Sequence, residues 1–123
     1  TYTSSSHCAR FTYTVTHTAP LSDPACEVAE CNCSICSRNG YLFIYVHQQN
    51  VAFANCSKSD LNKYTFGPKH KIAHYFCGTC GVSCFTQSED PEWYANYLAI
   101  NVRTFRDVDL KSLTLKAFDG KSV

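Results

Sequence analysis

The chain has 123 residues, the length of one ordinary domain, and hydrophobic residues make up 45% of it while charged residues make up 17%. This composition is typical of a globular protein and excludes a disordered chain. The formal net charge is +1 with acidic and basic residues scattered, and no apolar run is long enough to span a bilayer. We therefore expect neither a nucleic acid nor a membrane as a partner.

The predicted elements are mostly short strands, because large apolar residues alternate with polar ones along several segments. In chain order we expect strands at 11–16, 41–46, 51–54, 64–66, 71–76, 82–86, 97–102 and 113–115. Asn39-Gly40 and Gly67-Pro68 are turn signals, and single helical turns are expected at 60–62 and 107–113. The sequence therefore predicts a mainly β fold of about eight short strands with few short helical turns.

Nine cysteines in a chain of this length indicate either disulfides or metal ligands. The count is odd, so a disulfide framework would leave at least one thiol unpaired. Cys31 and Cys33 are too close in sequence to bridge each other without strain. The segment 77–81, Cys-Gly-Thr-Cys-Gly, has the spacing of a zinc knuckle. These features favour metal over disulfides, and with it a cytoplasmic protein.

The segment 31–36, Cys-Asn-Cys-Ser-Ile-Cys, offers three thiols to one ion. Residues two apart on an extended strand point to the same face, so Cys31 and Cys33 would approach the ion together, and a turn would bring back Cys36. Three thiolates leave one corner of a tetrahedral zinc site open, which is typical of a catalytic or exchangeable site. A fourth ligand would have to come from Cys26, His47, Cys56 or a more distant residue.

A second group of ligands is expected at a late hairpin. Cys77 and Cys80 lie between the predicted strands 71–76 and 82–86 and supply two ligands. Cys8 is the expected third ligand, and the fourth would be His7, water or another side chain. Such a metal would join the first strand to the hairpin, and a closure of this length constrains the unfolded chain strongly.

Three parts of the sequence resemble the glutathione-dependent formaldehyde-activating enzyme family, which includes the centromere protein V proteins. The family's N-terminal Cys-His-Cys, central Cys-x-Cys-x-x-Cys and late Phe-Cys-x-x-Cys-Gly are matched at 6–8, 31–36 and 76–81. The resemblance implies one domain over 1–123, folded as a β-tent of antiparallel sheets stapled by zinc. It also implies a structural zinc and a reactive, catalytic zinc, held by Cys8, Cys77 and Cys80 and by Cys31, Cys33 and Cys36 respectively.

The resemblance also implies a reaction, in which glutathione adds to formaldehyde and gives S-hydroxymethylglutathione, as in a carbon–sulfur lyase. Zinc would deprotonate the bound thiol, while three cysteinates would make the metal a weak Lewis acid toward the aldehyde. The candidate general bases are His47, His70 and His74. Arg38 would either meet a glutathione carboxylate or be a solvated turn residue.

The sequence departs from the family pattern at position 6, and two other functions compete with the one that the resemblance implies. Ser6 stands where the family has its first cysteine, and a neutral hydroxyl is a poor zinc ligand, so the zinc at Cys8 would be weakened or would recruit His7. If the central site were closed by a fourth ligand, the protein would be a non-catalytic zinc-binding β module for another macromolecule. Alternatively, the fold and zinc are kept while a different thiol or carbonyl compound is the substrate.

Overall fold

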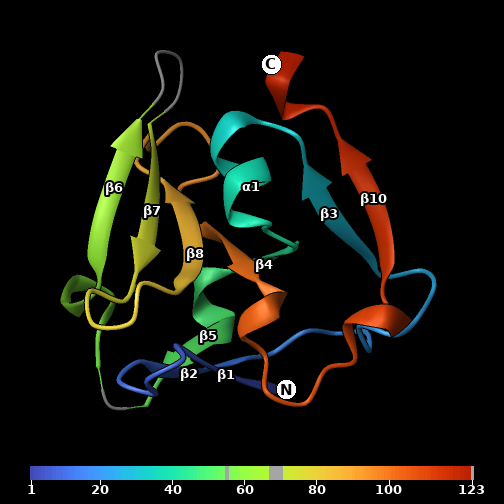
Figure 1. The fold of residues 1–123 in the computed structure, drawn as a ribbon, viewed down its shortest axis with the longest axis horizontal. Coiled ribbons are helices and arrows are strands. Elements are labelled where there is room, and N and C mark those ends of the chain that lie inside the picture. The colour runs from blue at the N-terminus through green and yellow to red at the C-terminus, as the bar shows by residue number, and fades with distance from the viewer. Residues whose placement is uncertain (55, 67–70, 123) are drawn as a thin grey trace.

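The computed structural model describes residues 1–54, 56–66 and 71–122. These residues form ten strands, one short α-helix and five 3₁₀ turns (Figure 1). The strands are β1 (Tyr2–Ser5), β2 (Thr12–Val15), β3 (Glu27–Cys31), β4 (Phe43–His47), β5 (Val51–Phe53), β6 (Asn62–Phe66), β7 (Ile72–Phe76), β8 (Ser83–Ser88), β9 (Tyr97–Asn101) and β10 (Thr114–Phe118). The helix is α1 (Ser34–Asn39), and the turns are Gln48–Asn50, Lys58–Asp60, Val102–Thr104, Leu110–Ser112 and Gly120–Ser122. Among the described residues, no helix has the length and apolar character to cross a bilayer.

Two sheets confirm the predicted mainly β fold. A small sheet has the strand order β1-β2-β5, and a large sheet has the order β10-β3-β4-β9-β8-β7-β6. The strand pairs are antiparallel, except that β10 runs parallel to β3 and sets Phe118 opposite Cys31. In the view of Figure 1, α1 lies between the β6–β7–β8 side of the large sheet and the β3–β10 side, and the small sheet lies at the opposite end of the molecule.

The alternation of side chains along each strand divides the interior into two clusters. Ile44 of β4 belongs to the main core, where the two sheets meet. There Tyr13 of the small sheet packs edge-on against Phe85 of the large one, with ring centroids 5.8 Å apart. Phe43, the residue before Ile44, belongs to a second cluster that holds α1 against the sheet and includes Cys36, Tyr41 and Ala99.

The predicted strands are present, with boundaries that differ by at most three residues. The helical turn predicted at 107–113 is present as Leu110–Ser112. The turn predicted at 60–62 was misplaced, because the 3₁₀ turn is Lys58–Asp60 and Asn62 already begins β6. Sequence reasoning missed β1, β3 and α1, because β1 is rich in hydroxyl residues and β3 carries one large aliphatic residue, Val28. The Gly67-Pro68 turn signal lies outside the described residues.

The local structure predicted for residues 31–36 was wrong. Cys31 ends β3, but Cys33 is already the N-cap of α1 and Cys36 lies inside this helix. Cys31 and Cys33 are therefore not neighbours on one strand. The predicted turn at Asn39-Gly40 is the end of the same helix, where Gly40 has a φ of 65°. Glycine adopts this left-handed conformation without a steric penalty, and the helix ends there.

Candidate metal centres

The first candidate centre consists of Cys31, Cys33 and Cys36, whose sulfur atoms all lie within 4.8 Å of one another. Sulfur ligands of a tetrahedral zinc site lie about 3.8 Å apart, so a small adjustment lets these three hold one ion. The start of α1 creates the cluster, because Cys33 is extended (φ −65°, ψ 167°) and Cys36 lies about one helical turn further on. The three sulfurs thus approach one point from a strand end, a helix cap and a helix.

The electrostatics of this centre favour a bound cation. Burial raises the pKa of Cys36, and the neighbouring Cys33 and Cys31 raise it further. Burial also raises the pKa of Cys33, but hydrogen bonds from Cys36, and then from Cys31 and Ile35, outweigh it and lower that pKa. The Cys33 amide also donates a hydrogen bond to Cys31 Sγ at a distance of 3.5 Å. Three thiols this close cannot all ionise at neutral pH without a counter-charge, which a divalent metal supplies.

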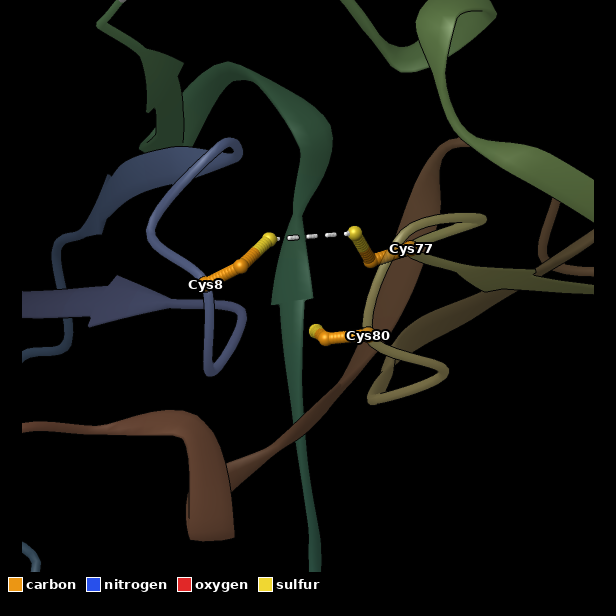
Figure 2. Close-up of side chains that lie close together, drawn as sticks. All are labelled: Cys8, Cys77 and Cys80. Carbon is orange, nitrogen blue, oxygen red and sulfur yellow. Dashed lines mark hydrogen bonds between the residues drawn. The ribbon is translucent and has the colours of Figure 1, made fainter.

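The second candidate centre joins two distant segments, as Figure 2 shows. Cys8 lies in the loop between β1 and β2, while Cys77 and Cys80 lie in the loop between β7 and β8. Their sulfurs also lie within 4.8 Å of one another, and Cys8 Sγ is 3.5 Å from Cys77 Sγ. The structure therefore brings together the three residues that sequence reasoning grouped at this site.

The turn after Cys77 shows why this loop presents two thiols on one side. Gly81 donates its amide to the Cys77 carbonyl at 2.8 Å and has a φ of 79°, which favours glycine. The Thr79 amide donates to Cys77 Sγ at 3.4 Å. Burial raises the pKa of Cys77, but hydrogen bonds from the Cys80 and Thr79 amides and from Cys8 outweigh it and lower that pKa to about 6. The loop is arranged to stabilise a thiolate.

Ser6 lies beside this centre in a structural role. Its side chain is buried, and its Oγ accepts the Phe11 amide at 3.3 Å and lies 3.6 Å from Cys8 Sγ. His7 is exposed and does not join the three sulfurs. The hydroxyl therefore closes the turn between β1 and β2 next to the metal ligands.

No further His, Cys, Asp or Glu of the described residues joins either cluster. Cys26 Sγ instead lies 4.0 Å from His17 Nδ1. Cys84 is fully buried in the main core, where burial raises its pKa to about 12, and Cys56 packs against that core. All nine cysteines lie in the described part of the chain and are free thiols, as metal binding requires.

An open pocket of about 460 Å³ lies beside the first centre and is lined by Cys31 and Cys36. Tyr41 lines it from the end of α1, and Phe118 and Asp119 line it from the C-terminal segment. Sequence reasoning missed these three residues. Nothing in the sequence indicates that the last strand returns to residues 31–36, because that contact depends on the parallel pairing of β10 with β3.

The candidate general bases lie in different surroundings. His74 is buried, its Nδ1 is 3.2 Å from the Tyr41 hydroxyl, and burial lowers its pKa to about 4. His47 lines a second pocket that has no residue in common with the first, and His70 lies outside the described residues. The Arg38 guanidinium donates to the Ser34 carbonyl of its own helix at 2.9 Å. Of the two described candidates, His47 and His74, His74 is the one linked to the pocket beside the first centre, through Tyr41.

Fold and site together define a mainly β protein with two three-cysteine clusters that could each hold a metal ion. Residues 1–115 match the model of the family described as glutathione-dependent formaldehyde-activating enzyme, and the chain belongs to this family. A crystal structure of a Rhodobacter sphaeroides protein has a similar fold, with a TM-score of 0.70 and 20% sequence identity. The alignment covers 93% of this chain and 99% of that one. No curated protein sequence matches the chain.

Proposed function

We propose that this protein adds glutathione to formaldehyde at a zinc ion held by Cys31, Cys33 and Cys36, forming S-hydroxymethylglutathione. In the reverse direction it is a carbon–sulfur lyase, and the reducing cytoplasm is the compartment that suits it. The family supports glutathione and an aldehyde as substrates. One observation carries the proposal: three clustered sulfurs have no fourth described ligand side chain, and two of the three cysteines, Cys31 and Cys36, line an open pocket.

Zinc, when bound, supplies an open position that deprotonates a thiol and keeps it beside the aldehyde. The three cysteines set the direction of that position, and with their three negative charges the site has a net charge of −1. Tyr41 and Phe118 form walls of the pocket in which the thiol lies. The thiol sulfur bonds to the aldehyde carbon, the carbonyl π pair moves to oxygen, and the proton lost by the thiol ends on that oxygen.

We also propose that Cys8, Cys77 and Cys80 hold a second, structural zinc. The 3.5 Å separation of Cys8 Sγ and Cys77 Sγ supports a shared ion, and so does the lowered pKa of Cys77. The neutral Ser6 hydroxyl adds no charge to this site, so its zinc is held less tightly than by four thiolates.

X-ray absorption at the zinc edge tests the proposed function. We expect glutathione to raise the number of sulfur ligands of the central zinc from three to four in the zinc-loaded protein. Cys33→Ala, which loses the central zinc, is the reference spectrum for the second site, and the difference from wild type isolates the central one. A central zinc that already has four protein ligands and does not respond to glutathione would contradict the proposal and favour a structural site.

A further inference from the structure

The C-terminal segment lies directly on the first metal centre. Beyond the pairing of Phe118 with Cys31, three hydrogen bonds attach the segment to Asn32, which stands between two of the sulfur ligands. The Asn32 amide donates to the Phe118 carbonyl at 3.1 Å, and its Nδ2 donates to Asp119 Oδ1 at 2.9 Å. The Lys121 amide donates back to Asn32 Oδ1 at 2.9 Å. One side chain thus holds both sides of the turn that follows β10.

Gly120 shows how closely this segment approaches the centre. A Cβ at this position would collide with Cys31 Sγ and would lie 3.4 Å from Cys33 Cβ. Because a side chain has no room there, glycine lets the backbone pack against two of the sulfur ligands. Figure 1 shows the C-terminal turn at the same end of the molecule as α1.

The same segment forms one wall of the pocket beside the centre. Among the described residues that line the pocket, the charged side chains are the carboxylates of Glu30 and Asp119, and none is a lysine or an arginine. The Arg103 guanidinium reaches the pocket's border by donating to the Gly40 carbonyl at 2.7 Å. A hydrogen bond from Ser122 and another from Asn32 hold the pKa of Asp119 below its usual range, so it is ionised at neutral pH.

The charge of this wall bears on the choice of thiol. A zinc ion with three thiolates is already negative, and an incoming thiolate adds another negative charge beside two carboxylates. A substrate that also carries an ammonium group offsets this charge, whereas one that carries only a carboxylate increases it.

We propose that the C-terminal segment is the substrate-selecting wall of the thiol site, and that Asp119, held by Asn32, favours thiols that carry an ammonium group. This inference rests on the proposed function, because it needs a thiol bound at the central metal. Glutathione carries such an ammonium group together with its two carboxylates. In bound glutathione the ammonium group would lie on the Asp119 side of the pocket.

Thiol affinities of the metal-loaded protein test the inference. The thiols are cysteamine, 2-mercaptoethanol and 3-mercaptopropionate, which are similar in size but carry a positive, neutral or negative group. Cobalt(II) in place of zinc reports their binding by its sulfur charge-transfer absorption. Asp119→Asn keeps an oxygen that can accept the Asn32 hydrogen bond but removes the charge. Asp107→Asn removes an exposed carboxylate outside the pocket lining and is the matched control.

We expect Asp119→Asn to reduce the preference for cysteamine over 3-mercaptopropionate by up to about tenfold, because one charge about 6 Å away in water changes the affinity of each thiol about threefold and the two changes have opposite signs. High salt should shrink this difference. The intrinsic acidity of each thiol is the same whichever protein it binds. A change in the ratio of the two thiol affinities between a variant and wild type therefore reports the charge of the protein. Gly120→Ala pushes the wall away from Cys31 and should reduce the same preference.

The outcomes separate this inference from the proposed function. If thiols bind and the preference among them is the same in wild type, Asp119→Asn and Asp107→Asn, the inference fails while the proposed function stands. If no thiol binds the metal-loaded wild type, both fail. A loss of preference that is equal in Asp107→Asn and Asp119→Asn would also overturn the role of Asp119, because it would reflect net charge alone.

Discussion

His74 is a buried histidine whose protonation opposes the folded state. Its imidazole lies in the large sheet, with Nδ1 3.2 Å from the Tyr41 hydroxyl, and its ring is tilted by 29° from that of Tyr41. Burial lowers its pKa from 6.5 to about 4, because the charged ring would lose its hydration. Between these two values, the unfolded chain binds a proton that the folded chain does not.

We therefore predict that His74 destabilises the protein as the pH falls from about 6.5 to about 4, by at most about 3 kcal/mol. His74→Asn, which keeps a polar atom near the position of Nδ1, should remove this part of the pH dependence. Urea unfolding of both proteins between pH 4 and pH 8 measures it. Loss of metal in acid affects both proteins, so the difference between the two curves reports His74. Parallel curves would contradict the prediction.

At the scale of single elements, the loop between β7 and β8 is a turn whose geometry needs one particular residue. Gly81 has a φ of 79°, and a Cβ added to it would meet nothing within 4 Å. A substitution there is therefore opposed by backbone strain alone and not by a clash. This strain would act directly on the position of Cys80.

We predict that Gly81→Ala destabilises the zinc-loaded protein by about 1 kcal/mol. Gly81→Asn should cost clearly less, because asparagine tolerates the left-handed region better than alanine does. Denaturant unfolding of the two variants, compared with wild type, gives the answer. Equal stability of all three proteins would mean that the loop does not hold this turn in solution.

At the scale of the whole molecule, the two candidate centres differ in what they connect. The first joins residues only five apart, at the end of β3 and the start of α1. In the second, Cys8 and Cys77 are 69 residues apart, and the metal would link the segment between β1 and β2 to the large sheet. Because a cross-link over a longer loop removes more freedom from the unfolded chain, the second centre should dominate stability.

We predict that Cys33→Ala loses one metal equivalent but keeps a folded domain, with a stability loss of about 2 kcal/mol, the effect expected for a cross-link over a short loop. Cys80→Ala should also lose one equivalent but should be destabilised by about 4 kcal/mol, the effect expected for a cross-link over a loop of this length. Metal content and thermal unfolding, measured on the same samples, decide between them. An equal loss of stability in the two variants would remove the distinction between a reactive and a structural centre.

Local spacing was enough to group Cys31, Cys33 and Cys36 and to pair Cys77 with Cys80, but not to add Cys8, which is 69 residues from Cys77. Ligand groups such as Cys77 and Cys80 fall within one turn, and period-two alternation located most of the strands. The path of the chain through residues 31–36 was predicted wrongly, because a six-residue helix with one buried side chain, that of Cys36, has too little apolar periodicity to be recognised. Zinc as the bound metal and the roles of the two centres stay predictions.

By itself, the sequence determined the mainly β class, the group Cys31, Cys33 and Cys36, and the pair Cys77 and Cys80, because each depends on residues close together in the chain. The contact of Cys8 with Cys77 joins residues 69 apart and depends on the tertiary structure. Only the tertiary structure decided that β10 pairs in parallel with β3, that Gly120 packs on Cys31, and that Asp119 lines the pocket. These contacts join residues almost 90 apart, as between Asn32 and Asp119. No local pattern encodes such a pairing, since it depends on which sheet edge remains free once the core has packed.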